Sequence, residues 1–260
     1  YNITGLVSMK NVLYILKEDR PFYLTSAGAV QVLADDTKHL ASTSGGKNSI
    51  TWQERLYMPY GTQSLVEYDE DANINWRDPA IDMSNLPDFD GQVMALSADE
   101  RYLFAAIDND TKVEILSGSY ETIDGSTGWH WHGALVELTL AGCELLFVSN
   151  IFKRRLWICS TSASDSLYYM PLYDGYGDPL TDSNRLFQTD GNFITPYLHG
   201  DFKADDKAHF ELIEHLGHAY DANIYFEAHY QKANDTTWTK IADLKGTATN
   251  RVATAYIPVD

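Results

Sequence analysis

The feature that most constrains the fold of this chain is a Leu-aromatic dipeptide that recurs four times in its first two thirds. The four copies sit at the same point of a longer pattern: Leu13-Tyr14, Leu56-Tyr57, Leu103-Phe104 and Leu156-Trp157. Successive leucines are 43, 47 and 53 residues apart, a spacing typical of four-stranded propeller blades. The sequence therefore predicts four copies of one supersecondary unit, with the four leucines equivalently buried between the units.

Apolar segments flank each dipeptide in the same order. One precedes it, and a polar turn and another apolar segment follow it, within residues 4–24, 49–68, 92–116 and 145–170. A weaker outer segment follows in the first three units, at 30–33, 73–76 and 129–132. Evenly spaced short runs rich in Val, Ile, Tyr, Phe and Trp predict an all-β chain. We expect a β-propeller, either a complete four-bladed ring or part of a larger one; an evenly spaced β-sandwich is the alternative.

A change of composition near residue 174 marks a domain boundary. Residues 173–182 are rich in Gly, Pro and Asp, which is typical of a linker or a long turn. The period is lost beyond it, and five strand-like segments follow, at 193–197, 208–213, 223–230, 237–241 and 251–258. The sequence predicts propeller blades over 1–180 and a small antiparallel β-sandwich over 181–260. Because both ends of the chain run directly into strands, we expect a processed or excerpted piece of a longer polypeptide.

The charge and hydrophobicity of the chain limit its partners. The formal net charge is −18, and a surface this acidic repels nucleic acid and anionic lipid. At 44% hydrophobic residues the chain can bury a core, but it has no apolar run near the roughly 20 residues of a membrane-spanning helix. We therefore expect neither nucleic-acid binding nor membrane insertion.

The two cysteines lie on successive predicted strands of the fourth unit. A hairpin that turns near residues 152–153 places Cys159 opposite Leu145, two residues from Cys143. A disulfide between them would need a shift of register, so we predict buried free thiols. Two cysteines are also too few for a zinc site.

One acidic turn has the spacing of a calcium loop. Asp69, Asp71 and Asn73 alternate as oxygen donors do at the start of such a loop. Ile74 stands where an EF-hand requires glycine, and Ala80 stands where it requires glutamate. The alternatives are a calcium site and an ordinary acidic turn, and we expect no resident cofactor.

The outer strand of the third unit has the most distinctive local pattern. In Trp129-His130-Trp131-His132, strand alternation puts both imidazoles on one face and both indoles on the other. His130 and His132 could share a ligand, or could be ordinary edge-strand histidines. The indoles of Trp129 and Trp131 could stack on a sugar ring or anchor a protein partner, or they could pack between adjacent units. These four residues are the candidate binding site.

Catalytic chemistry has little support in the sequence. Glycosidases on propeller scaffolds use paired carboxylates, whereas most acidic residues here lie in turns, where they usually cap backbone N–H groups. The sialidase Asp-box has only a degraded counterpart at residues 233–238, outside the repeat. We therefore expect no enzyme; a secreted propeller glycoside hydrolase or carbohydrate-binding protein is the alternative.

Three features together resemble the virion proteins of tailed bacteriophages. They are the Leu-aromatic strands, the outer strand at 129–132, and the segment at 185–196, which reads Arg-Leu-Phe-Gln-Thr-Asp-Gly-Asn-Phe-Ile-Thr-Pro. The resemblance covers most of the chain. It implies a non-enzymatic structural or adhesion component of the particle, in the tail or a fibre. It also implies partners among other virion proteins and further copies of the chain, and a host-surface glycan for an adhesion module.

Overall fold

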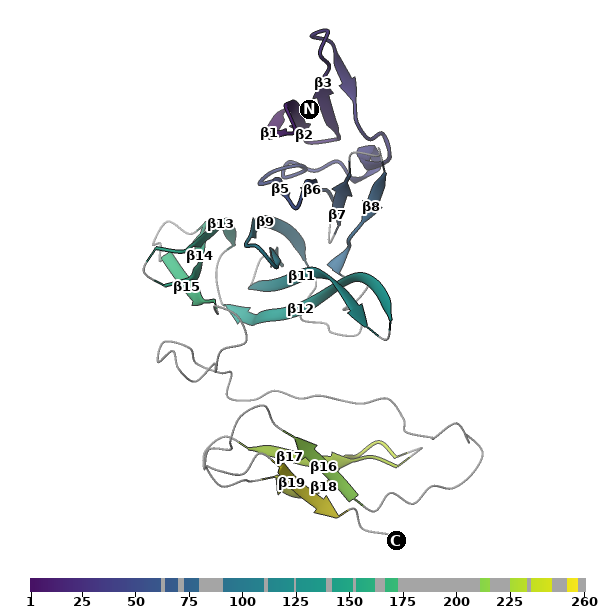
Figure 1. Cartoon of the computed structure of the whole chain (residues 1–260), viewed down its shortest axis with the longest axis vertical. Coiled ribbons are helices and arrows are strands. Elements are labelled where there is room, and N and C mark those ends of the chain that lie inside the picture. The colour runs from purple at the N-terminus through teal and green to yellow at the C-terminus, as the bar shows by residue number, and fades with distance from the viewer. Residues whose placement is uncertain are drawn as a thin grey trace, which may run out of the picture. The chain divides into compact units, whose positions relative to one another are not determined.

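The chain forms an all-β structure, seen in a computed structural model. The structure describes residues 1–61, 64–69, 73–79, 91–109, 112–123, 125–138, 142–151, 153–161, 167–172, 211–215, 225–232, 235–244 and 252–256. The described elements are β-strands and one short 3-10 helix, η1 (Asp36–Leu40) (Figure 1). The all-β prediction is therefore confirmed. The chain divides into two compact units, residues 1–177 and 178–260; the predicted boundary between 180 and 181 lies outside the described residues.

The described residues of unit 1 form four antiparallel sheets that follow one another along the chain. Sheet 1 consists of β1 (Ile3–Met9), β2 (Val12–Lys17), β3 (Pro21–Leu24) and β4 (Val30–Val32). Sheet 2 consists of β5 (Ile50–Trp52), β6 (Arg55–Pro59), β7 (Leu65–Tyr68) and β8 (Ile74–Trp76). Sheet 3 consists of β9 (Gln92–Ala98), β10 (Leu103–Asp108), β11 (Val113–Ile123) and β12 (Ser126–Leu138). Sheet 4 consists of β13 (Cys143–Ser149), β14 (Arg155–Ser160) and β15 (Leu167–Pro171). Neighbours in sequence are neighbours in each sheet, so every sheet is a simple meander.

The first hairpins of sheets 1 and 2 have the same turn. Lys10 and Asn11 both have positive φ, as do Gln53 and Glu54 at the equivalent place in sheet 2. Two consecutive residues of this kind make a type I′ turn, whose twist matches that of the flanking strands. The two turns also contact each other, because Lys10 Nζ lies 3.0 Å from Glu54 Oε2.

Three hydrophobic clusters join the four sheets in succession. Between sheets 1 and 2 the buried residues are Met9, Tyr14, Leu16, Leu56, Met58, Tyr60 and Val66. Between sheets 2 and 3 they are Trp52, Tyr57, Leu65, Val93, Leu96, Leu103, Ala105, Ile107, Leu116 and Trp131. Between sheets 3 and 4 they are Ala95, Phe104, Ala106, Val113, Ile115, Cys143, Leu146, Leu156 and Ile158. Within the described residues none of these clusters joins sheet 4 to sheet 1, and no closed ring of sheets is seen.

Each Leu-aromatic dipeptide lies on the second strand of its sheet. Within a dipeptide the leucine and the aromatic side chain point to opposite faces of the sheet, because successive strand residues alternate. In sheet 2, Leu56 packs toward sheet 1 and Tyr57 toward sheet 3. Leu103 and Leu156 are fully buried in the same way, each against the preceding sheet. The prediction of four equivalent leucines is wrong for Leu13, which is 37% exposed. The physical reason is that no sheet of the described structure packs on that face of sheet 1.

The first strands of consecutive sheets pack on one another, and a single asparagine connects three of them. β5 contacts β1 and β9, and β9 contacts β13. Asn48 precedes β5 with φ +56, a conformation that asparagine tolerates better than most residues. Its Nδ2 donates to the carbonyl oxygens of Met94 and Glu144, both at 2.8 Å. Asn48 therefore holds sheets 2, 3 and 4 together at one place.

The thiols of unit 1 are free. Leu145 pairs with Cys159 in the β13–β14 register, as the sequence predicts. Cys143 is buried as predicted, whereas the prediction of a buried thiol is wrong for Cys159, which is half-buried. Burial raises the pKa of the Cys143 thiol to about 12. This thiol therefore stays protonated at neutral pH and behaves as a small apolar side chain.

The described residues of unit 2 form two antiparallel strand pairs. β16 (Glu211–His215) pairs with β19 (Val252–Tyr256), and β17 (Phe226–Tyr230) pairs with β18 (Thr239–Leu244). Their described core consists of small residues with one leucine: Ala228, Leu244, Ala253 and Ala255. The strand predicted at 193–197 lies outside the described residues.

Candidate functional site

A group of ionisable side chains surrounds the buried carboxylate of Glu67, between sheets 2 and 3. Glu67 lies in the middle of β7 and is fully buried. Its carboxylate accepts hydrogen bonds from Arg77 Nε at 2.9 Å, from Arg55 Nη1 at 3.2 Å and from Tyr120 Oη at 2.9 Å. Asn75 Nδ2 adds a further bond at 3.3 Å. Both carboxylate oxygens are therefore engaged by donors, and the charge is compensated by two guanidinium groups.

Tyr120 connects this carboxylate to sheet 3. Burial, followed by the hydrogen bond to Glu67, raises the pKa of the Tyr120 phenol. The phenol therefore stays protonated and donates to the carboxylate. Arg55 stacks over its ring, with Cζ 4.6 Å from the ring centroid. The group is a crosslink between two sheets, in which each charge has a partner.

Both predicted binding indoles lie beside this group. Trp131 is buried between sheets 2 and 3, and its Nε1 donates to Arg77 O at 3.1 Å. Trp129 is partly buried and packs edge-on against Tyr120 and Trp131, each at 5.3 Å between ring centroids. The two indoles thus pack between adjacent sheets, which is the second of the two possibilities that the sequence left open for them.

Gly118 of β11 makes room for the two indoles. A Cβ atom on this glycine would lie 2.5 Å from Trp129 Cζ2 and 2.7 Å from Trp131 Cε3. The rings therefore lie directly on the bare backbone of the neighbouring strand, an arrangement known from aromatic rescue of strand glycines. Sequence reasoning missed this residue because a glycine between two serines resembles a loop.

The predicted imidazoles lie on the other face of β12. His132 Nε2 lies 3.1 Å from Glu121 Oε1, and Ser119 Oγ donates to the same oxygen at 2.7 Å. The bond from Ser119, together with the charge of His132, lowers the pKa of Glu121. Glu121 is an acidic neighbour that the sequence did not identify. In the described residues, nonetheless, no three or more His, Cys, Asp or Glu side chains are placed to hold a metal ion.

The predicted calcium turn closes on itself where it is described. Asp69 Oδ1 accepts from the Asn73 backbone N at 2.9 Å, and Asp69 Oδ2 accepts from Asn73 Nδ2 at 3.2 Å. Asp71 lies outside the described residues. The two described members therefore form a capped turn, the usual role of aspartate and asparagine in such places.

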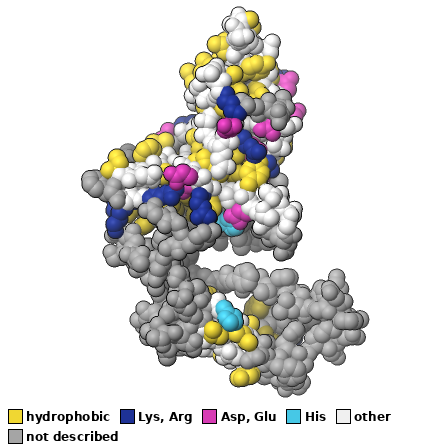
Figure 2. All heavy atoms as spheres, viewed as in Figure 1, with side chains coloured by type: hydrophobic (Ala, Val, Ile, Leu, Met, Phe, Trp, Pro, Cys, Tyr) yellow, Lys and Arg dark blue, Asp and Glu magenta, His cyan; other side chains and the backbone are white. Residues whose placement is uncertain are grey.

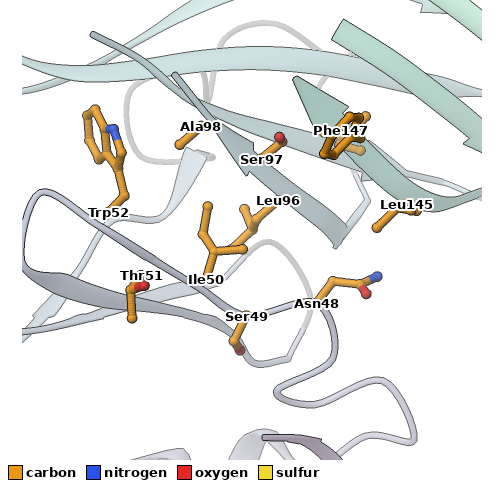
Figure 3. A pocket seen from close by; sticks show the side chains of 11 residues that line it. Asn48, Ser49, Ile50, Thr51, Trp52, Leu96, Ser97, Ala98, Leu145 and Phe147 are labelled. Atoms are coloured by element: carbon orange, nitrogen blue, oxygen red, sulfur yellow. The ribbon is translucent and has the colours of Figure 1, made fainter. Parts of the chain in front are cut away.

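A hollow of about 450 Å³ opens where the first strands of sheets 2, 3 and 4 meet. Figure 3 shows Ile50 and Leu96 pointing toward each other across it, with Phe147 and Leu145 on the side of β13. The remaining lining residues are Asn48, Ser49, Thr51, Trp52, Ser97, Ala98 and Leu146. Apart from the amide of Asn48, the lining side chains are apolar or carry hydroxyl groups, which suits packing or stacking contacts.

The chain matches no model of a known protein family, and no curated protein is significantly similar to it. Among its described helical residues there is no stretch long and apolar enough to cross a membrane.

Proposed function

We propose that this chain is a non-enzymatic structural or adhesion component of a tailed-bacteriophage virion, with the four sheets as β-propeller blades and a β-sandwich after them. The virion assignment rests on the resemblance of the sequence. The propeller is supported by the order of the sheets and by the packing of their first strands, β1 on β5, β5 on β9 and β9 on β13. Blades of a propeller contact one another in this way around a central axis.

The observation that carries the non-enzymatic part is the closed environment of Glu67. A catalytic carboxylate must reach substrate and change its protonation or bonding during the reaction. Glu67 is fully buried, and donors from Arg55, Arg77 and Tyr120 occupy its oxygens. The group therefore joins two sheets of the chain, and its carboxylate is not free to act as a catalytic acid, base or nucleophile.

Two experiments test this proposal. Antibodies raised against the purified chain should label the tail or fibres of intact particles in electron micrographs, whereas labelling confined to the medium would refute the virion role. The purified chain should also leave a panel of glycosides intact. Turnover that disappears when a single carboxylate is changed to its amide would establish an enzyme instead.

The second candidate is a secreted carbohydrate-binding protein or glycoside hydrolase, and the hollow is the observation that favours it. Phe147 lies at the edge of the hollow and is 57% exposed, so its ring presents a flat face on which a sugar ring can stack. Binding on a glycan array that is lost in Phe147→Ala would support this candidate.

A further inference from the structure

One face of sheet 4 carries three aromatic side chains in line. The register of β13, β14 and β15 aligns Phe147, Trp157 and Tyr169 across the three strands, and we call these residues the aromatic row. Phe147 is 57% exposed and Tyr169 is 38% exposed. Hydrophobic side chains and Lys or Arg side chains both reach the surface over sheet 4, at the left of Figure 2. Rings exposed side by side on a sheet mark a binding surface.

A guanidinium group is stacked on this row. Arg155 stands two residues before Trp157 on β14, so its side chain lies on the same face of the sheet. Its Cζ is 4.2 Å from the ring centroid of Tyr169 and 5.8 Å from that of Trp157. Stacking restricts the side chain and uses the flat face of the guanidinium, whereas the N–H donors lie in its plane. The donors therefore stay available for a hydrogen-bonded partner.

Carboxylates are abundant in this chain, whose formal net charge is −18, yet none of the described ones pairs with Arg155. Four other arginines of unit 1 each form an ion pair with a carboxylate: Arg20, Arg55, Arg77 and Arg154. For Arg155 the described residues provide two rings and no acidic group. The charge of this arginine is thus available to compensate an anion on a ligand.

We propose that Arg155 and the aromatic row bind a glycan through a sugar residue that carries a carboxylate, such as a uronic or sialic acid. The planar guanidinium matches the geometry of a carboxylate and can donate two parallel hydrogen bonds to it. The C–H face of the sugar ring is apolar and stacks on an exposed ring of the row. This inference rests on the adhesion role in the proposed function, and it gives that role a ligand class and a site.

The charge of the whole chain favours an isolated carboxylate over a polyanion. A net charge of −18 repels a long polyanion such as a nucleic acid. A single carboxylate in contact with Arg155 is held locally, because exposed charges farther away than about 8 Å are largely screened at physiological ionic strength. Sulfate and phosphate groups accept hydrogen bonds from the same donors, so sulfated and phosphorylated glycans belong in the experiment.

This site differs from the hollow, although Phe147 borders both. The side chains that line the hollow carry no charge. A sugar bound in the hollow would therefore be held equally well with or without a carboxylate, whereas a sugar bound at Arg155 would not. Selectivity for the carboxylated sugar is the property that separates the two sites.

The experiment applies the whole 260-residue chain to an array of oligosaccharides that end in a uronic or sialic acid, each beside its neutral counterpart. Sulfated and phosphorylated oligosaccharides form further arms, and isothermal titration calorimetry measures the strongest binder. The parent chain should bind carboxylated sugars more tightly than their neutral counterparts. Arg155→Gln should weaken binding of the carboxylated sugar by about 10-fold or more, the effect of losing hydrogen bonds to a charged group. Arg155→Lys keeps the charge without the planar donors and should restore only part of the affinity.

Lys17→Gln is the matched control. Lys17 also lies over an aromatic ring, with Nζ 5.3 Å from the centroid of Phe22, but it belongs to sheet 1. Its substitution makes the same change of net charge and should leave binding of the carboxylated sugar unchanged. Near-ultraviolet circular dichroism verifies folding of each variant, and Arg155→Lys alone decides the comparison if Arg155→Gln fails to fold.

Three results would overturn the inference. They are an array on which no carboxylated oligosaccharide binds, binding that is the same in Arg155→Gln as in the parent, and binding of sulfated or phosphorylated glycans without the carboxylated ones. Binding that is lost in Phe147→Ala and unchanged in Arg155→Gln would place the sugar in the hollow instead. Antibody labelling of particles tests the virion role separately: labelled particles with no binding of carboxylated glycans would refute this site and keep that role.

Discussion

Replacing Glu67 by glutamine should destabilise unit 1 more than any surface charge does. The amide keeps one acceptor oxygen, but its NH₂ group turns a donor toward Arg55, Asn75 or Arg77, which are themselves donors. Two guanidinium groups are then left close together without their carboxylate. Removing one member of a buried ion pair costs about 3–5 kcal/mol.

The lower end of that range applies, because Arg55 and Arg77 keep 33% and 21% of their side-chain surface in water. We expect a loss of about 3 kcal/mol, which for a unit of this size lowers the melting temperature by about 6–12 °C. The assay is thermal and urea unfolding of the whole chain, followed by near-ultraviolet circular dichroism of the tryptophans.

Glu144→Gln is the matched control. Glu144 is 52% exposed on its side chain and pairs with Lys47 at 2.6 Å, and such surface pairs contribute about 0–1 kcal/mol. Salt near 0.5 M should remove the small effect at Glu144 and leave the effect at Glu67, since buried pairs are screened far less. If the free energy of unfolding of Glu67→Gln lay within about 1 kcal/mol of the parent value, the crosslink would be refuted. A loss of stability that disappears in salt would refute it as well.

Three further predictions test the packing. Leu56→Ala should cost about 2–5 kcal/mol and Leu13→Ala less than about 1 kcal/mol in urea unfolding of monomeric protein, because only Leu56 is fully buried; equal costs would contradict the assigned faces. Gly118→Ala should cost about 1–3 kcal/mol by overlap with the two indoles, whereas Gly128→Ala, whose Cβ meets only a histidine nitrogen at 3.4 Å, should be nearly neutral. Cys159 should react with iodoacetamide at pH 8 well before Cys143. The raised pKa of Cys143 means that its contribution to stability is complete below about pH 9 and declines as the pH rises toward about 12, so alkaline unfolding should be delayed in Cys143→Ala.

Strand positions were the part of the fold most accessible to sequence. β8 occupies residues 74–76, within the segment predicted at 73–76, and Cys159 pairs with Leu145 as predicted, because hydrophobic spacing and turn residues determine both. The long strands β11 and β12 were predicted only in part. Residues 117–119 read Ser-Gly-Ser, which has low strand propensity, and the indoles that cover this glycine come from another strand.

The candidate site was less predictable, for two physical reasons. Glu67 is the one charged residue in the strand 65–68, and a lone charge in an apolar strand could have indicated a buried ion pair. Its partners Arg77 and Tyr120 lie 10 and 53 residues away in the sequence, so they could not be identified. The exposure of Leu13 was not predictable, because a repeat pattern indicates equivalent positions without indicating which unit lacks a neighbour.

The serial packing of the sheets has a consequence for how unit 1 opens. In a structure where each repeat contacts only its neighbours, the outermost repeats are held on one side and the inner ones on two, so opening starts at the ends. β10 is buried at five of its six positions, whereas β2 and β14 are each buried at only two. Amide hydrogen exchange should therefore be slowest in β6 and β10 and faster in β2 and β14.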